Sequence, residues 1–139
     1  MRIDRDSEFG ARVARRLEQE QIVWLTTVRA DGTPQPSPVW FWWDGTAFLI
    51  YSQPDTPKLR NIAAHPRVAL NFESDSNGDD IVVFNGDAQI ASQVPPADQV
   101  PAYVEKYRTG FQNLGMTPAE FAAIYSVAIR VTPTSVRGF

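Results

Sequence analysis

Basic side chains gather at a predicted helix start, in the stretch SQPDTPKLRNIAAHPRV that covers residues 52–68. Thr56 has the residue type of a helix N-cap, and Pro57 suits the first helical position because its missing N–H would have no partner there. The backbone amides at such a start favour an anion by roughly 0.3–1 kcal/mol when they are exposed. The stretch therefore indicates a place where an anionic group could bind.

The residue spacing divides this predicted helix, residues 58–64, into two faces. Lys58 and Asn61 lie three residues apart, so a cation and an amide would share one face beside the Thr56 hydroxyl. The other face is apolar and would pack on the protein, through Leu59, Ile62 and Ala63. Two interpretations stay open from the residues alone: a phosphate-sized anion site, or a capped surface helix with a few basic side chains. Arg60 is expected to point partly away from Lys58.

Nucleophilic and metal chemistry have little support in the sequence. The chain has no cysteine and a single histidine, His65, which stands before Pro66 where the helix should end. A histidine at that place more often serves the helix terminus than catalysis. No carboxylate pair stands out as an acid–base couple, so we assign no catalytic side chain and no metal site.

Three prolines at alternate positions mark the next notable segment, TPQPSPVWFWW. Because the backbone groups of a strand alternate between its two edges, Pro34, Pro36 and Pro38 remove N–H donors from the same edge. That edge cannot be fully paired. We therefore expect it to be either an exposed rim or the lip of a pocket.

The aromatic residues that follow these prolines occupy both faces of the same strand. Trp40 and Trp42 share one face, while Phe41 and Trp43 share the other. Both faces therefore need an apolar cover. The core would cover one of them, and dense packing, a subunit interface or a flat ligand would cover the other.

These segments belong to an alternation of short strands and helices. Strands are predicted over residues 22–28, 34–43, 47–52, 68–73, 81–92 and 126–132, with Gly86 at a bulge or bend of the fifth. Helices are predicted over residues 7–21 and 58–64, through most of residues 94–115, and after the capping box Thr117–Glu120. Short turns join most strands, which implies antiparallel pairing. Six strands with little helical cover favour a small barrel.

The bulk composition limits the class of protein. With 139 residues, 43% of them hydrophobic, the chain is expected to form a single domain over residues 1–139. Its net charge of −3 argues against a general nucleic-acid binder. The N-terminal stretch lacks the apolar segment of a signal peptide, and no run of about 18 apolar residues occurs. We therefore expect a cytoplasmic protein without a membrane span.

Four segments together resemble the pyridoxamine 5'-phosphate oxidase-like split-barrel flavoproteins. More narrowly, they resemble the actinobacterial branch that uses the deazaflavin cofactor F420. The segments are LTTVRADGTPQPSPVWFWWDG, LIYSQPDTPKLRNIAAHPRVAL, VVFNGDAQI and VTPTSVRGF, and the resemblance runs from about Phe9 to Phe139. It implies a mainly β (α+β) fold: a six-stranded antiparallel split β-barrel with flanking helices, of the FMN-binding split barrel type. It also implies a homodimer with the cofactor at the interface.

The resemblance further implies a set of cofactor-binding residues. The family's phosphate-binding segment falls on Ser52, Thr56, Lys58, Arg60 and Asn61. The strand that borders the ring system falls on Ser37, Pro38, Val39, Trp40 and Phe41, whose backbone would contact the ring. Arg137 is expected to approach the site, from this chain or from a partner. The hydroxyls of Tyr51 and Ser37 are candidate proton donors.

The implied reaction is the transfer of a hydride from C5 of reduced F420 to an electron-poor double bond of a small substrate. The alternatives are an FMN-dependent oxidoreductase of the same fold, a non-catalytic cofactor carrier or ligand sensor, and a haem-degrading split barrel. The single histidine is a poor candidate iron ligand for the last of these. Basic and histidine residues that oxidase members use for pyridoxal phosphate have no matching set here, which favours the deazaflavin branch. The long glutamate tail of F420 should need further cations, for which the candidates are Arg60, Arg67 and Arg137.

Overall fold

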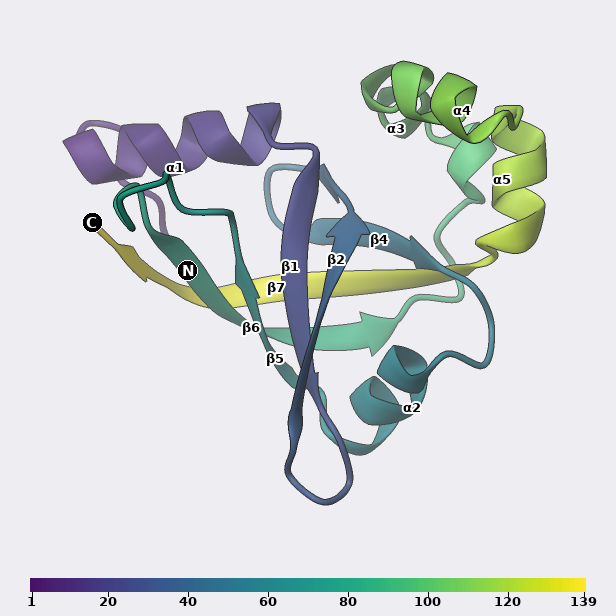
Figure 1. Ribbon diagram of the computed structural model, residues 1–139, viewed down its shortest axis with the longest axis horizontal. Helices are drawn as coiled ribbons and strands as arrows, with labels where there is room; N and C mark the ends of the chain where they lie inside the picture. Colours follow the sequence, from purple (N-terminus) through teal and green to yellow (C-terminus); the bar gives the residue numbers. More distant parts are fainter.

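The computed structural model describes residues 1–139 and shows one antiparallel sheet that curls into an open barrel with helices around it (Figure 1). The strands are β1 (Ile22–Val28), β2 (Pro34–Trp40), β3 (Trp42–Trp43), β4 (Phe48–Ser52), β5 (Arg67–Asn71), β6 (Val82–Ile90) and β7 (Val127–Gly138). Their order in the sheet is β2-β1-β5-β6-β7-β4-β3. The helices are α1 (Glu8–Gln19), α2 (Pro57–Ala64), α3 (Pro101–Lys106), α4 (Arg108–Leu114) and α5 (Pro118–Ile124), with a 3₁₀ turn at Ala97–Gln99.

The predicted split barrel with flanking helices is confirmed, with seven strands in place of six. The additional strand arises because the segment expected as one strand over residues 34–43 is interrupted at Phe41. The Phe41 N–H donates to the Tyr107 hydroxyl at 2.7 Å, and its carbonyl accepts from Lys106 Nζ at 2.7 Å. The helical segment therefore engages the backbone that would otherwise continue the sheet. β2 and β3 are the two ends of the strand order, and β2 and β4 are not paired with each other.

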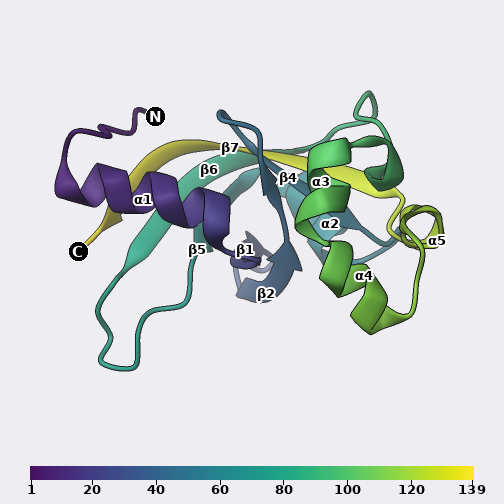
Figure 2. The same ribbon diagram turned by 90° about the horizontal axis from the view of Figure 1, so that it is seen from above.

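Two clusters of buried side chains hold the fold together. The first fills the barrel and joins the inner face of the sheet to α1 and α2, with Val13, Leu17, Leu59 and Ile62 as the helical contributions. The second lies outside the barrel, where α3, α4 and α5 pack on β2, β3 and β4. In Figure 2 these three helices gather at one end of the barrel while α1 lies toward the other.

The second cluster decides what covers Trp40 and Trp42. Both side chains pack against it, whereas Phe41 and Trp43 belong to the barrel core, so the expected division of faces is confirmed. The sequence left three possible covers for Trp40 and Trp42: packing, a subunit interface or a ligand. In the structure, aromatic side chains of α3–α5 from the same chain provide most of this cover.

β7 is longer than predicted and reaches Gly138 in place of ending at residue 132. Pro133 is tolerated because the β6–β7 ladder changes register between Asn85 and Gly86, so the hydrogen-bond pattern is already interrupted there. The irregularity predicted at Gly86 is thereby confirmed, and a Cβ on that residue would lie 2.7 Å from the Thr132 carbonyl oxygen. None of the helices combines the length and the hydropathy that a bilayer span requires.

Candidate cofactor site

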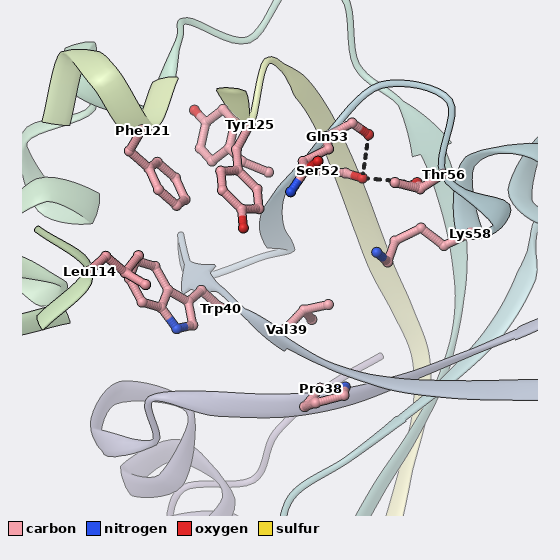
Figure 3. Close-up of a pocket in the computed structure, with 11 residues that line it drawn as sticks. Pro38, Val39, Trp40, Ser52, Gln53, Thr56, Lys58, Leu114, Phe121 and Tyr125 are labelled. Atoms are coloured by element: carbon pink, nitrogen blue, oxygen red, sulfur yellow. Dashed lines mark hydrogen bonds between the residues drawn. The ribbon is translucent and has the colours of Figure 1, made fainter. Parts of the chain in front are cut away.

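A cavity of about 430 Å³ opens between β2 and β4 and collects most of the predicted residues (Figure 3). The predicted residues that line it are Pro38, Val39, Trp40, Tyr51, Ser52, Thr56 and Lys58. Gln53, Leu114, Phe121 and Tyr125, which were not predicted, complete the lining. The cavity has a polar end, formed where β4 leads into α2, and an aromatic end, formed by β2 with α4 and α5.

Two hydroxyls and an ammonium define the polar end. Ser52 Oγ lies 3.1 Å from Thr56 Oγ1 and donates to the Gln53 carbonyl at 2.8 Å (Figure 3). Thr56 occupies the predicted N-cap position of α2, and Pro57 the predicted first helical position, but the Thr56 hydroxyl makes no capping bond. The predicted helix start is therefore confirmed, while the Thr56 hydroxyl points to Ser52 and does not cap the helix.

Lys58 is the only cation in the cavity lining. Its side chain is half-buried and extends its ammonium into the space between Ser52 and Val39 (Figure 3). It forms no salt bridge, since the ion pairs of this chain join other residues, and desolvation alone lowers its pKa. A partly desolvated charge without a counter-ion is costly, and an anion bound beside it removes that cost.

The aromatic end is a layered stack centred on Trp40. Its ring lies 4.4 Å from that of Tyr107 with planes 3° apart, and 5.3 Å from that of Phe121 with planes 15° apart. Phe121 in turn stacks on Tyr125 at 4.4 Å and 11°. No charged side chain lines this end of the cavity. It is therefore suited to a flat, largely apolar group.

The open edge of β2 forms one lip of the cavity. β2 is the first strand of the sheet order, so the prediction that its proline edge cannot be fully paired is confirmed. Pro34, Pro36 and Pro38 lie opposite Val28, Thr26 and Trp24 of β1. These are the non-hydrogen-bonded pairs of the ladder, where the missing N–H of proline costs no bond to β1. The carbonyl oxygens of the three prolines consequently point away from β1.

Two further cavities continue from the polar end along α2. The first, of about 340 Å³, shares Lys58 with the main cavity and is lined by Ser37 and Asn61. Asn61 is 8% exposed and donates from Nδ2 to Thr27 Oγ1 at 2.9 Å. The second, of about 430 Å³, shares Asn61 and is lined by Arg29 and Arg60. The order along the surface is thus aromatic residues, one lysine, polar side chains and two arginines.

Some predicted residues lie away from the cavity. Phe41 points into the barrel core with 0% exposure, and its backbone groups are taken by Tyr107 and Lys106, so it is not free to contact a ring. Arg137 lies opposite Val83 of β6, near the C-terminal end of β7. The β7 residue opposite Ser52 is Val127, roughly 30 Å away from Arg137 along the strand. Within one chain, Arg137 does not reach the cavity.

The two candidate proton donors and the remaining basic residue are also placed by the structure. The Tyr51 hydroxyl donates to the Pro95 carbonyl at 2.6 Å, and desolvation raises the pKa of Tyr51 to about 12. This hydroxyl is therefore committed elsewhere. Ser37 lies in the neighbouring cavity, on the side of Lys58 away from the aromatic stack. Arg67 is exposed and pairs with Asp87 at 3.1 Å, outside all three cavities.

The residues that sequence reasoning missed come from α4 and α5. Phe121 and Tyr125 are four residues apart at the end of a capped helix, which identifies them as one face. That spacing could have marked them as buried aromatics. Nothing local in the sequence shows that their partner is Trp40, about 80 residues away, because that contact depends on how the helices fold back over β2.

Comparisons with known proteins agree with this architecture. The sequence model described as pyridoxamine 5'-phosphate oxidase matches residues 9–139. A solved structure named F420 reductase is 31% identical, with a TM-score of 0.67 over 87% of this chain and 92% of that chain. A search of curated protein sequences found no match.

Two more distant structures share the fold. A conserved hypothetical protein from Mycobacterium tuberculosis is 23% identical, with a TM-score of 0.72 over 94% of this chain and 82% of that chain. HutZ, a haem storage protein from Vibrio cholerae, is 13% identical, with a TM-score of 0.64 over 99% of this chain and 95% of that chain. At these identities the likeness concerns the fold alone.

Proposed function

The chain belongs to the pyridoxamine 5'-phosphate oxidase family, and on that premise we propose that it is an F420-dependent oxidoreductase acting on a small unsaturated substrate. The observation that carries this proposal is the half-buried, unpaired ammonium of Lys58 in a cavity whose other end is a stack of aromatic rings. A ligand that fits must join an anionic group to a flat ring system. Flavin-type cofactors have this construction.

The residues of the cavity fit such a cofactor group by group. Lys58, with the hydroxyls of Ser52 and Thr56, would hold the phosphate through charge-assisted hydrogen bonds of about 1.5–3 kcal/mol each. The ring would lie toward Trp40, along the lip formed by Pro38 and Val39.

Two features favour F420 over FMN. The phosphate of FMN ends its chain, whereas F420 continues from its phosphate into a polyanionic glutamate tail. Beyond Lys58 the surface continues through the cavity at Asn61 to the one lined by Arg29 and Arg60, which would give that tail space and positive charge. The likeness to the structure named F420 reductase, at 31% identity, points the same way.

The chain's own contribution to the reaction would be position and exclusion of water. When bound, the reduced cofactor supplies a hydride from C5 of its ring. Trp40 is held between Tyr107 and Phe121, so it presents a fixed apolar surface to the reacting groups. No carboxylate or histidine lines the cavity, and the Tyr51 hydroxyl donates to Pro95. The proton that completes the reduction would therefore come from solvent or from the Tyr125 hydroxyl, which belongs to the cavity lining.

A second copy of the chain would complete the site. The residues Pro38, Trp24, Asn71, Val83 and Arg137 lie directly opposite one another on successive strands, in a row across the sheet from β2 to β7. Their side chains share the face that points away from the barrel core, where Trp24 and Val83 are only partly buried. A two-fold axis near Asn71, in the middle of the row, would bring Arg137 of the partner subunit toward Pro38. We therefore propose a homodimer with the cofactor near the interface.

Turnover tests the enzymatic part of the proposal. Reduced F420 is mixed with the protein and a panel of quinones and enones, and the return of oxidised-cofactor absorbance is followed with time. Turnover that depends on the protein is expected for at least one acceptor. Tight F420 binding without turnover of any acceptor would favour a cofactor carrier, and turnover with reduced FMN alone would favour an FMN enzyme.

A further inference from the structure

The hydroxyl of Tyr107 joins three segments of the chain. It accepts a hydrogen bond from the Phe41 N–H at 2.7 Å, and it lies 2.7 Å from the Gln21 carbonyl and 2.8 Å from the Phe41 carbonyl. A hydroxyl has one proton to donate, and Lys106 Nζ already donates to the Phe41 carbonyl at 2.7 Å. We therefore assign the Tyr107 proton to Gln21, which precedes β1, while a lone pair of the hydroxyl holds the break between β2 and β3.

The ring of Tyr107 forms the layer behind Trp40. The two rings lie 4.4 Å apart with planes 3° apart, and Trp40 is the residue that precedes Phe41. Trp40 lines the cavity (Figure 3), whereas Tyr107 is 1% exposed and does not belong to the lining. Tyr107 therefore fixes Trp40 in two ways, through the face of its ring and through the backbone of the next residue.

The Tyr107 hydroxyl is not available as a proton donor for a ligand. Desolvation raises the pKa of Tyr107, and its hydrogen bonds are made within the chain. Tyr103, whose ring lies 4.9 Å from that of Tyr107, has a buried hydroxyl without any hydrogen-bond partner. The two neighbouring tyrosines share one aromatic cluster, but of the two only Tyr107 uses its hydroxyl to tie the helices to the strand that carries Trp40.

We propose that Tyr107 is a positioning residue, whose hydroxyl sets the orientation of Trp40 and with it the aromatic end of the cavity. This inference rests on the proposed function, in which the cofactor ring and the substrate meet at that end. Ser52, Thr56 and Lys58 lie where β4 leads into α2, at the polar end of the cavity. Loss of the Tyr107 hydroxyl should therefore leave cofactor affinity nearly unchanged and slow the reaction, because the rate depends steeply on how the reacting groups are oriented.

The test compares Tyr107→Phe, which removes the hydroxyl and keeps the ring, with two control variants. Tyr107→Phe leaves the Phe41 N–H buried without its partner, so a loss of stability is expected as well. Tyr103→Phe removes the neighbouring hydroxyl that has no partner. Val82→Ala lowers stability from the barrel core, at a residue that is 0% exposed and lies opposite Gly138 at the end of β7 far from the cavity.

Three measurements are made on each protein. The dissociation constant of oxidised F420 comes from a fluorescence titration. The single-turnover rate is that at which bound reduced F420 is reoxidised by a quinone or enone that the wild type uses. Fluorine NMR of protein labelled with fluorotryptophan reports the packing of Trp40 without any cofactor, and Trp40→Phe assigns its resonance among those of the four tryptophans.

For Tyr107→Phe we expect an altered Trp40 resonance, an F420 dissociation constant within about threefold of the wild-type value, and a single-turnover rate that is roughly tenfold lower or more. Tyr103→Phe and Val82→Ala should keep the wild-type rate and the wild-type Trp40 resonance. An unchanged rate or an unchanged Trp40 resonance in Tyr107→Phe would overturn the inference. An equal loss of rate in Val82→Ala would overturn it too, since lower stability alone would then explain the effect.

Failure of the proposed function is distinguishable from failure of this inference. If the wild type neither binds nor turns over F420, the proposed function and the kinetic effect fall together, while an altered Trp40 resonance in Tyr107→Phe still supports the positioning of Trp40. If circular dichroism shows that Tyr107→Phe does not fold, Lys106→Met tests the same junction, because the Phe41 carbonyl then competes with Gln21 for the Tyr107 proton. Lys106→Met should change the Trp40 resonance and lower the rate, and wild-type values of both would overturn the inference.

Discussion

The hydroxyls of Ser52 and Thr56 lie 3.1 Å apart, across the loop that leads from the last residue of β4 to the start of α2. This contact uses the hydroxyl that would ordinarily cap α2, and it fixes the helix start against the end of the strand. Lys58, two residues after Thr56, is thereby directed into the cavity beside β2, the strand that carries Trp40. The anion site depends on this junction more than on the helix alone.

Replacing Lys58 with alanine tests the role of its ammonium. We expect at least a tenfold loss of F420 affinity, because one charge-assisted hydrogen bond contributes about 1.5–3 kcal/mol. A fluorescence titration measures the loss. Arg67→Ala, which removes an exposed cation paired with Asp87 outside the cavities, is the control and should bind F420 as wild type does. Equal affinities of Lys58→Ala and wild type would remove the phosphate site from the account.

Reversing the charge of Arg60 tests the extension of the groove. Arg60→Glu should weaken F420 with a long glutamate tail several-fold, because a carboxylate replaces one of the two cations of the third cavity. The effect should shrink as salt is raised, since the site is exposed. FMN, which ends at its phosphate, is the matched control ligand. A loss of the same size for both ligands would show that Arg60 acts on α2 rather than on the tail.

Gly110 lies under the ring of Trp40, and a Cβ there would be 2.8 Å from Trp40 Cη2. Helix propensity alone predicts that Gly110→Ala stabilises α4 by about 1 kcal/mol. The stacked rings on either side of Trp40 leave it little freedom to move, so we expect overpacking to dominate and to lower the free energy of unfolding by about 1 kcal/mol or more. Urea denaturation measures this, with the exposed neighbour Thr109→Ala as control. A more stable Gly110→Ala protein would mean that Trp40 is mobile.

The pH dependence of stability should report the environment of Lys106. Desolvation lowers its pKa to about 8 from the ordinary 10.5, although its ammonium donates to the Phe41 carbonyl. Between these two values the unfolded chain binds more protons than the folded one, so this residue makes stability rise with pH. We therefore expect the free energy of unfolding of wild type to increase from pH 8 to pH 10 relative to Lys106→Met, in urea titrations at each pH. If the free energies of unfolding of the two proteins changed with pH in the same way, the burial of the Lys106 ammonium would be contradicted.

Much of the fold follows from local signals in the sequence. The start of α2 at Thr56-Pro57, the capping box at Thr117 and the irregularity at Gly86 each reflect a local backbone requirement, and each lies where the pattern indicated. The open edge of β2 could be predicted in the same way, because a missing N–H prevents full pairing of an edge in any strand. The strand predicted over residues 126–132 was too short, because whether a strand continues through Pro133 depends on a register shift in the neighbouring strand.

The parts of the site that escaped prediction depend on contacts between distant segments. The break at Phe41 is made by Tyr107 and Lys106, more than 60 residues later, and the aromatic end by Phe121 and Tyr125. Helical spacing correctly predicted Asn61 beside Lys58 and Arg60 pointing partly away from it, but which cavity each one lines follows from the packing of α2 against β1 and β6. Local periodicity carries no information of that kind.

A side-by-side fluorescence titration of the wild-type protein with F420 and with FMN shows whether Lys58 and the aromatic stack form one F420 site. We expect micromolar or tighter binding of F420, clearly weaker binding of FMN, and loss of the F420 signal at high salt. Tighter binding of FMN would assign the cavity to a flavin enzyme of the same family. Binding of neither cofactor would contradict the assignment of Lys58 and the aromatic stack to a single cofactor site.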